Sequence, residues 1–120
     1  MTTAKVNPNG ADYASAVLRL YLELPGTPRR VRLHDRRCAA ELYRRAVSIA
    51  TVEAALLLAS LRRLTRPPDA PRLSPVRSLA YFLPVVEELL ENPMPDGYQD
   101  YLRTKMRLLT HGCSRSPVNC

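Results

Sequence analysis

The segment AALLLASL, residues 54–61, constrains the fold of this chain more strongly than any other stretch. It is apolar on every side of a helix, as is typical of a helix that is surrounded by others. The hydroxyl of Ser48 can accept a backbone N–H at a helix start, and the pattern that follows predicts a helix over residues 49–64. We expect this helix to be the central element of the core.

Apolar side chains at helical spacing predict four further helices. They are expected over residues 13–24, 36–45, 75–91 and 98–109. Residues 18–24 also alternate as a strand would. The chain offers no second strand of similar quality to pair with them, so helix is the better interpretation.

The same patterns predict how the helix over residues 36–45 is held. Asp35 is expected to cap its first turn. Tyr43 and Ala46 are expected on its buried side, because they continue its apolar face. The arginines of this helix would then face the solvent.

Two expectations concern the C-terminal half of the chain. The pair Ser74 and Pro75 is a favourable helix start, and Pro84, inside the helix that follows, should introduce a kink. Tyr98 and Tyr101 fall on the apolar side of the last expected helix.

Together these elements predict an all-α fold, a small bundle of about five helices. A single domain over residues 11–109 is the simplest account, because no internal repeat or low-complexity tract divides the chain. Residues 1–10 and 110–120 lack periodicity, and we expect them to be a flexible arm and a flexible tail.

Charge is distributed unevenly along the chain, whose formal net charge is +7. Residues 29–66 hold ten arginines and three acidic residues, whereas residues 67–102 hold two arginines and six acidic residues. A strongly basic stretch attracts polyanions, which makes nucleic acid the implied partner. An arginine-rich proteome, in which Arg replaces Lys on solvated faces, is the alternative explanation, because sixteen of the eighteen basic residues are Arg.

The arginines of the basic stretch come mostly as pairs at linkers and helix ends, where they can reach phosphates without disturbing the core. We predict a nucleic-acid contact set that consists of these arginines and two hydroxyl residues: Arg29, Arg30, Arg32, Arg36, Arg37, Arg44, Arg45, Ser48, Thr51, Arg62, Arg63 and Arg66. Cations near helix C-termini also favour the helix dipole, which explains some of them without a ligand. The hypothesis requires the guanidinium groups to gather on one side of the folded bundle.

The stretch CAAELYRRAVSIATVEAAL, residues 38–56, resembles a helix-turn-helix. Ala39 or Ala40 would be the small residue of the first helix, and Val52 would be the apolar residue inside the second. The resemblance implies a helix-turn-helix-like pair in the N-terminal half of the bundle. It also implies DNA binding, with the second helix in the major groove.

By that resemblance, the positions that face the bases are Ser48, Ala50, Thr51 and Glu53. Their side chains are small or acidic, Ala46 stands where many such turns have Gly, and no Arg, Asn or Gln is present for a bidentate base contact. Two antiparallel helices without a nucleic-acid role are the alternative, because this arrangement recurs in every α-bundle.

A slightly longer stretch, residues 35–56, is also similar to the three-helix repeats of RecX-type regulators of recombination. It has a looser similarity to helical DNA-binding parts of plasmid and mobile-element replication initiators. Both resemblances imply DNA-binding helices, and the second implies a mobile element as the source.

The composition also bears on location. No apolar run approaches the roughly 18–20 residues needed to cross a bilayer, and residues 1–10 have no apolar stretch of a signal peptide. Cys38, Cys113 and Cys120 form no CxxC pair, which favours a reducing compartment. We therefore expect a cytoplasmic protein without membrane contact.

No catalytic, metal or cofactor site is expected. His111, Cys113 and Cys120 do not follow the spacing of structural zinc ligands. His34 beside Asp35 has no Ser or Cys nucleophile in a recognisable pattern, and the chain has no Gly-rich phosphate loop.

The sequence therefore predicts a non-catalytic DNA-binding accessory or regulatory protein that places an Arg-rich helical surface on the backbone of double-stranded DNA. The alternative is a protein-protein interaction module, a helical adaptor or dimerisation domain. It would dock onto a partner or another copy through the acidic helix over residues 75–91, with contacts from Tyr81 and Phe82.

Overall fold

The computed structural model describes residues 10–28, 30–71 and 73–112, and within these residues every regular element is helical. The elements are α2 (Gly10–Leu22), α3 (Leu33–Arg44), α4 (Ile49–Leu64), the 3-10 turn η1 (Leu79–Phe82), α5 (Leu83–Glu91), α6 (Tyr98–Arg107) and the π-helical turn η2 (Leu108–Gly112). The expected all-α bundle of five helices is confirmed.

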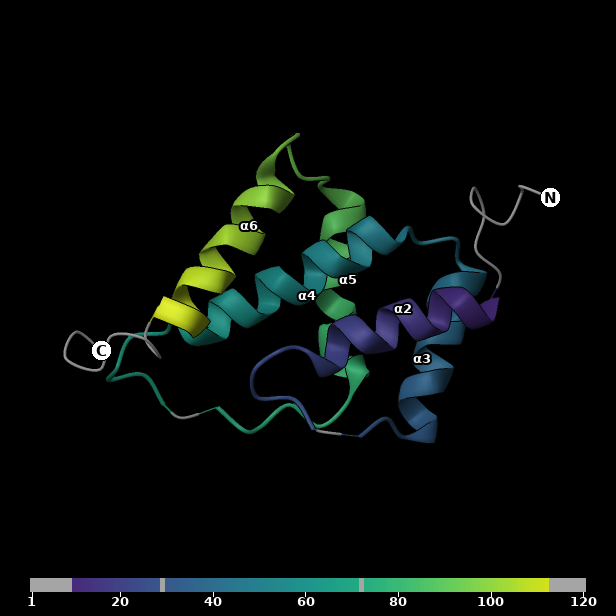
Figure 1. The fold of residues 1–120 in the computed structure, drawn as a ribbon, viewed down its shortest axis with the longest axis horizontal. Helices are drawn as coiled ribbons and strands as arrows, with labels where there is room; N and C mark the ends of the chain where they lie inside the picture. The colour runs from purple at the N-terminus through teal and green to yellow at the C-terminus, as the bar shows by residue number, and fades with distance from the viewer. Residues whose placement is uncertain (1–9, 29, 72, 113–120) are drawn as a thin grey trace.

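The central position expected for the 49–64 helix is confirmed by α4, against which α2, α5 and α6 all pack (Figure 1). Its bounds are those expected, and Ser48 caps it, with Oγ accepting the N–H of Thr51 at 3.1 Å. Eight of its residues are buried: Val52, Ala54, Ala55, Leu56, Leu57, Ala59, Ser60 and Leu61. Helix α3 lies outside this group and packs on α2 and η1.

The start of α3 differs from the expectation. The helix begins at Leu33, so Asp35 is its third residue instead of its cap, and the carboxylate is buried. Asp35 Oδ2 accepts the N–H of Arg32 at 2.9 Å, and Oδ1 accepts the N–H of Leu79 at 2.9 Å. A buried carboxylate needs such donors, and one of them comes from η1, 44 residues away.

The end of α3 also corrects two expectations. Ala46 is exposed with φ of 60°, and Tyr43 is 42% exposed. The N–H groups of Ala46 and Val47 bond to the carbonyls of Tyr43 and Leu42, which is a Schellman motif with Ala46 at the left-handed position. The chain thus turns directly after α3. The ring centroids of the exposed Tyr43 and of Tyr13 are 5.3 Å apart.

The segment before α5 is not the helix that the pair Ser74 and Pro75 suggested. The first helical turn begins at Leu79 and is capped by Ser78, whose Oγ accepts the N–H of Ala80. Pro84 therefore stands in the first turn of α5, a position that tolerates proline, directly after the 3-10 turn η1.

The apolar side of α6 is narrower than expected. Leu102 and Met106 are buried against Leu57 and Leu61 of α4. Tyr98 and Tyr101, predicted on that side, are 38% and 52% exposed and stack on one another with ring centroids 5.4 Å apart.

Most of the expected flexible arm and tail lies outside the described residues, as does Arg29. Gly10, assigned to the arm, opens α2, and residues 110–112 belong to η2. Within the described part of the chain, no helix combines the length and the apolar character that a membrane span requires.

Candidate nucleic-acid interface

Of the nine predicted contact arginines that the structure describes, three form ion pairs with carboxylates. Arg44 pairs with Glu41 of the same helix. Arg45 and Arg62 pair across the bundle, with N···O distances of 2.5 Å to Glu87 and 2.7 Å to Glu88 on α5. We call these four residues the paired face: Arg45, Glu87, Arg62 and Glu88. Each guanidinium lowers the pKa of its carboxyl partner, chiefly through its hydrogen bonds.

A third ion pair between helices joins α6 to α4. Arg103, which was not in the predicted set, donates to Glu53 of α4 at 2.7 Å and to Asp100 at 2.9 Å. Gln99 Nε2 donates to the same Glu53 carboxylate at 2.8 Å. These bonds lower the pKa of Glu53. Glu53, an acidic residue of the basic stretch, is thus paired with an arginine from outside that stretch.

Arg63 and Arg66 make a different kind of contact. Arg63 donates to the hydroxyl of Tyr81 at 3.1 Å and to the carbonyl of Ser74 at 2.9 Å. Arg66 donates to the carbonyl of Pro71 at 2.7 Å. These acceptors are uncharged, so they fix the guanidinium groups without cancelling their positive charge.

The remaining four arginines, Arg30, Arg32, Arg36 and Arg37, surround the first turn of α3. All four are exposed, and none forms an ion pair with another described residue. This end of the helix also carries the positive end of its dipole, which favours anions.

The structure adds Arg77 to this group. Arg77 is exposed and lies two residues before Leu79, whose N–H binds Asp35 in the first turn of α3. Sequence analysis missed it because it follows the proline-rich loop, in the half of the chain that is acidic overall. No local signal indicates the contact with α3. We call the five residues the basic edge: Arg30, Arg32, Arg36, Arg37 and Arg77.

The basic edge is formed by two segments far apart in sequence. In Figure 1 the loop between α2 and α3 and the loop between α4 and η1 run along the same edge of the molecule. A hollow lined by Pro25 and Gly26 of the first loop and Pro67 and Pro68 of the second brings them together.

The positions that a helix-turn-helix would turn to the bases are largely engaged within the bundle. Ser48 donates its hydroxyl to Thr51 Oγ1 at 2.9 Å in addition to capping α4, and Thr51 is half-buried. Glu53 is bonded to α6. Ala50 is exposed but has no polar group. The start of α4 therefore provides few free hydrogen-bonding groups for base edges.

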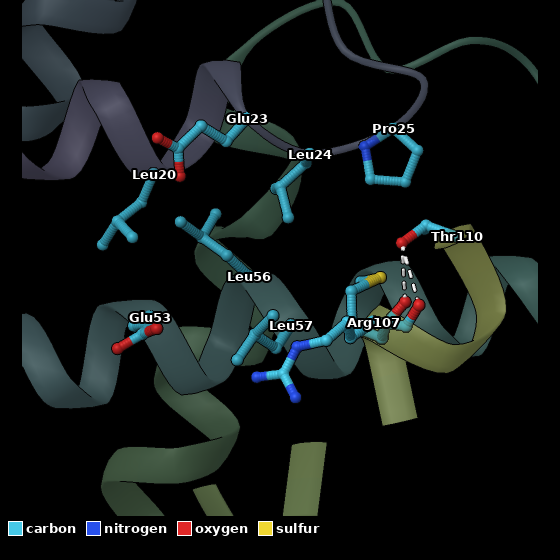
Figure 2. A pocket seen from close by; sticks show the side chains of 10 residues that line it. Leu20, Glu23, Leu24, Pro25, Glu53, Leu56, Leu57, Arg107 and Thr110 are labelled. Carbon is cyan, nitrogen blue, oxygen red and sulfur yellow. Dashed lines mark hydrogen bonds between the residues drawn. The ribbon is translucent and has the colours of Figure 1, made fainter. Parts of the chain in front are cut away.

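A cleft of about 370 Å³ opens between the end of α2, the middle of α4 and the end of α6 (Figure 2). Leu56 and Leu57 form its floor, while Glu23, Glu53 and Arg107 lie around it. Two carboxylates disfavour a phosphate backbone here, so this cleft lies apart from the basic edge in chemistry as well as in place.

Burial raises the pKa of titratable side chains near the core. Cys38 Sγ lies 3.9 Å from His34 Nε2, but burial raises the pKa of the thiol, which disfavours the thiolate nucleophile. Burial and the Asp35 carboxylate raise the pKa of Tyr21 to about 12. The Tyr21 hydroxyl is buried and has no hydrogen-bond partner among the described residues.

Comparison of the chain with protein-family models, with curated proteins and with solved structures gives no match, so the function is inferred from the geometry above.

Proposed function

We propose that this protein is a non-catalytic, nucleic-acid-binding accessory protein that holds the phosphate backbone of duplex DNA at the basic edge. One observation carries the proposal: five exposed arginines, four in or beside the start of α3 and Arg77 on the segment that bonds to it, have no carboxylate partner among the described residues. Guanidinium groups bind phosphate oxygens with paired N–H donors, and the attraction is independent of base sequence.

The geometry favours general binding over sequence recognition. The hydroxyls of Ser48 and Thr51 serve the cap of α4, and the neighbouring Glu53 would repel phosphates. The basic edge would therefore supply affinity and orientation, while any choice of target comes from another part of an assembly.

The test measures the affinity for an arbitrary labelled duplex by fluorescence anisotropy between 50 and 200 mM salt. If about four of the five arginines meet phosphates, affinity falls on the order of a hundredfold over this range. The double variant Arg36→Gln, Arg37→Gln should bind about tenfold more weakly at 50 mM and show a salt slope lower by about two.

The matched control is Arg44→Gln, Arg45→Gln, which changes net charge by the same amount at the C-terminal end of the same helix. Because these arginines are paired with Glu41 and Glu87, their loss should reduce affinity much less. Equal losses in both variants, or no binding by the unmodified protein at micromolar concentration, would contradict the proposal.

The alternative, an interaction module, is favoured by the cleft of Figure 2. An apolar floor with charged residues around it suits the apolar side of a partner helix. The acidic helix itself offers less than expected, because Phe82 is buried in the core and two of the α5 carboxylates, Glu87 and Glu88, are paired. Light scattering after size exclusion separates the two: a dimer that fails to bind duplex favours the interaction module.

A further inference from the structure

The last turn of α4 lies between two hollows of the surface. One, of about 340 Å³, is lined by the ring of Tyr81 together with Ala59 and Val85. The other, of about 410 Å³, has four prolines in its lining: Pro25, Pro67, Pro68 and Pro71. Arg63, Arg66 and Leu73 line both hollows, so the two arginines form a ridge between them.

The ridge is held in place and remains charged. Arg63 lies over the ring of Tyr81, with Cζ 5.3 Å from the centroid, and donates to the Tyr81 hydroxyl and the Ser74 carbonyl. Arg66 is tied to the Pro71 carbonyl. Each guanidinium has five N–H donors, and these bonds use two of them on Arg63 and one on Arg66.

Negative groups nearby do not cancel this charge. Glu88 is already paired with Arg62, and Asp69, in the loop after α4, lines neither hollow. The C-terminal end of the α4 dipole corresponds to about half a negative charge, against two guanidinium groups on the ridge.

We propose that the ridge and its two hollows bind one step of a single-stranded nucleic acid, with a phosphate on Arg63 and Arg66 and the flanking unpaired bases in the hollows. Arg63 covers one face of the Tyr81 ring, and the side chain is 42% exposed, so a base would stack on the face that Arg63 leaves. Proline rings give the second base a flat apolar surface. The inference rests on the proposed function, because the basic edge supplies the rest of the affinity.

The arrangement favours a nucleic acid over a phosphopeptide. A phosphotyrosine has one ring and a terminal phosphate, and would leave one hollow empty. A strand repeats base, phosphate and base, which matches a charged ridge between two apolar hollows.

The experiment compares two labelled single strands of equal length, homothymidine and a fully abasic strand, by fluorescence anisotropy at 100 mM salt. Both carry the same phosphates, so the ratio of their affinities reports the bases alone. The unmodified protein should prefer homothymidine on the order of tenfold. Tyr81→Leu should remove most of that preference, and Tyr81→Phe should keep it, because the ring remains.

Two controls separate the site from the basic edge. Tyr101→Leu removes a tyrosine of similar exposure on α6, away from both hollows, and should leave the preference unchanged. Arg36→Gln with Arg37→Gln should weaken both strands equally. Circular dichroism verifies that each variant is folded.

The outcomes distinguish the two proposals. Equal affinity of the unmodified protein for the two strands, or a preference that survives Tyr81→Leu, overturns the single-strand site while phosphate binding at the basic edge stands. Failure to bind any strand or duplex overturns both. A competition experiment tests the peptide alternative: a phosphotyrosine peptide and free phosphate are each used to displace homothymidine from the protein. If the peptide does so at a tenfold lower concentration than phosphate, the hollows bind a peptide and the inference is overturned.

Discussion

The basic edge and the paired face contain arginines of the same sequence stretch, yet they differ in what surrounds them. Arg36 and Arg37 at the start of α3 have no carboxylate partner among the described residues, whereas Arg45, just after its end, binds Glu87 of α5. The difference arises because α5 packs on α4 and brings its acidic side chains to Arg45 and Arg62, and not to the start of α3. Net charge along the sequence therefore does not measure the field at the surface.

The largest expected effect is that of replacing Asp35, whose carboxylate bonds to both segments of the basic edge. Asp35→Ala leaves the buried N–H of Leu79 without an acceptor and removes a charge-assisted bond to the Arg32 N–H. We expect a loss of about 3 kcal/mol in the free energy of unfolding, measured by urea titration with circular dichroism. Asp69→Ala, at an exposed loop position, should change it by less than about 0.5 kcal/mol. A loss at Asp35 as small as that at Asp69 would show that the anchor is dispensable.

The turn between α3 and α4 provides a second test, because it sets the position of the basic edge relative to the paired face. Ala46 has φ of 60° and is exposed, so its Cβ is strained and contributes little packing. Ala46→Gly should raise the free energy of unfolding by about 1 kcal/mol. Ala40→Gly, exposed within α3, should lower it by a similar amount. Destabilisation by both changes would argue against the left-handed turn.

Removing the carboxylates of the paired face should leave its arginines without ion-pair partners, as in the basic edge. Glu87→Gln with Glu88→Gln releases Arg45 and Arg62 and should raise affinity for duplex DNA about threefold at 50 mM salt. Stability should hardly change, because exposed ion pairs contribute about 0–1 kcal/mol. Glu91→Gln with Asp96→Asn is the matched control, since it removes two exposed carboxylates that pair with no described arginine. An equal gain in both variants would mean that only total charge matters.

The parts of the fold that sequence analysis predicted are those set by local patterns. The bounds of α4 and its Ser48 cap follow from a hydroxyl before an apolar run, and both are as expected. The start of α3 is not predictable in this way, because Asp35 owes its burial to a donor 44 residues away. Arg77 and the pairing of Arg62 with Glu88 depend on the same long-range packing. The sequence thus indicated that arginines would form the candidate site, but not which arginines belong to it.

The smallest expected effect on the free energy of unfolding is that of the contact between Glu53 and Arg103, and this effect should depend on pH. Hydrogen bonds from Arg103 lower the pKa of Glu53 below its ordinary value of 4.5, so the folded state is favoured while this carboxyl is charged. Glu53→Gln should cost about 0.5 kcal/mol at pH 7, since the pair is partly exposed. The difference from the unmodified protein should persist down to about pH 4.5 and disappear as the pH falls through the lowered pKa, because both proteins then carry a neutral group. Urea titrations between pH 7 and pH 3 measure it. A difference that stays constant to pH 3 would mean that the Glu53 side chain acts through packing, and that α4 and α6 are not joined by charge at this point.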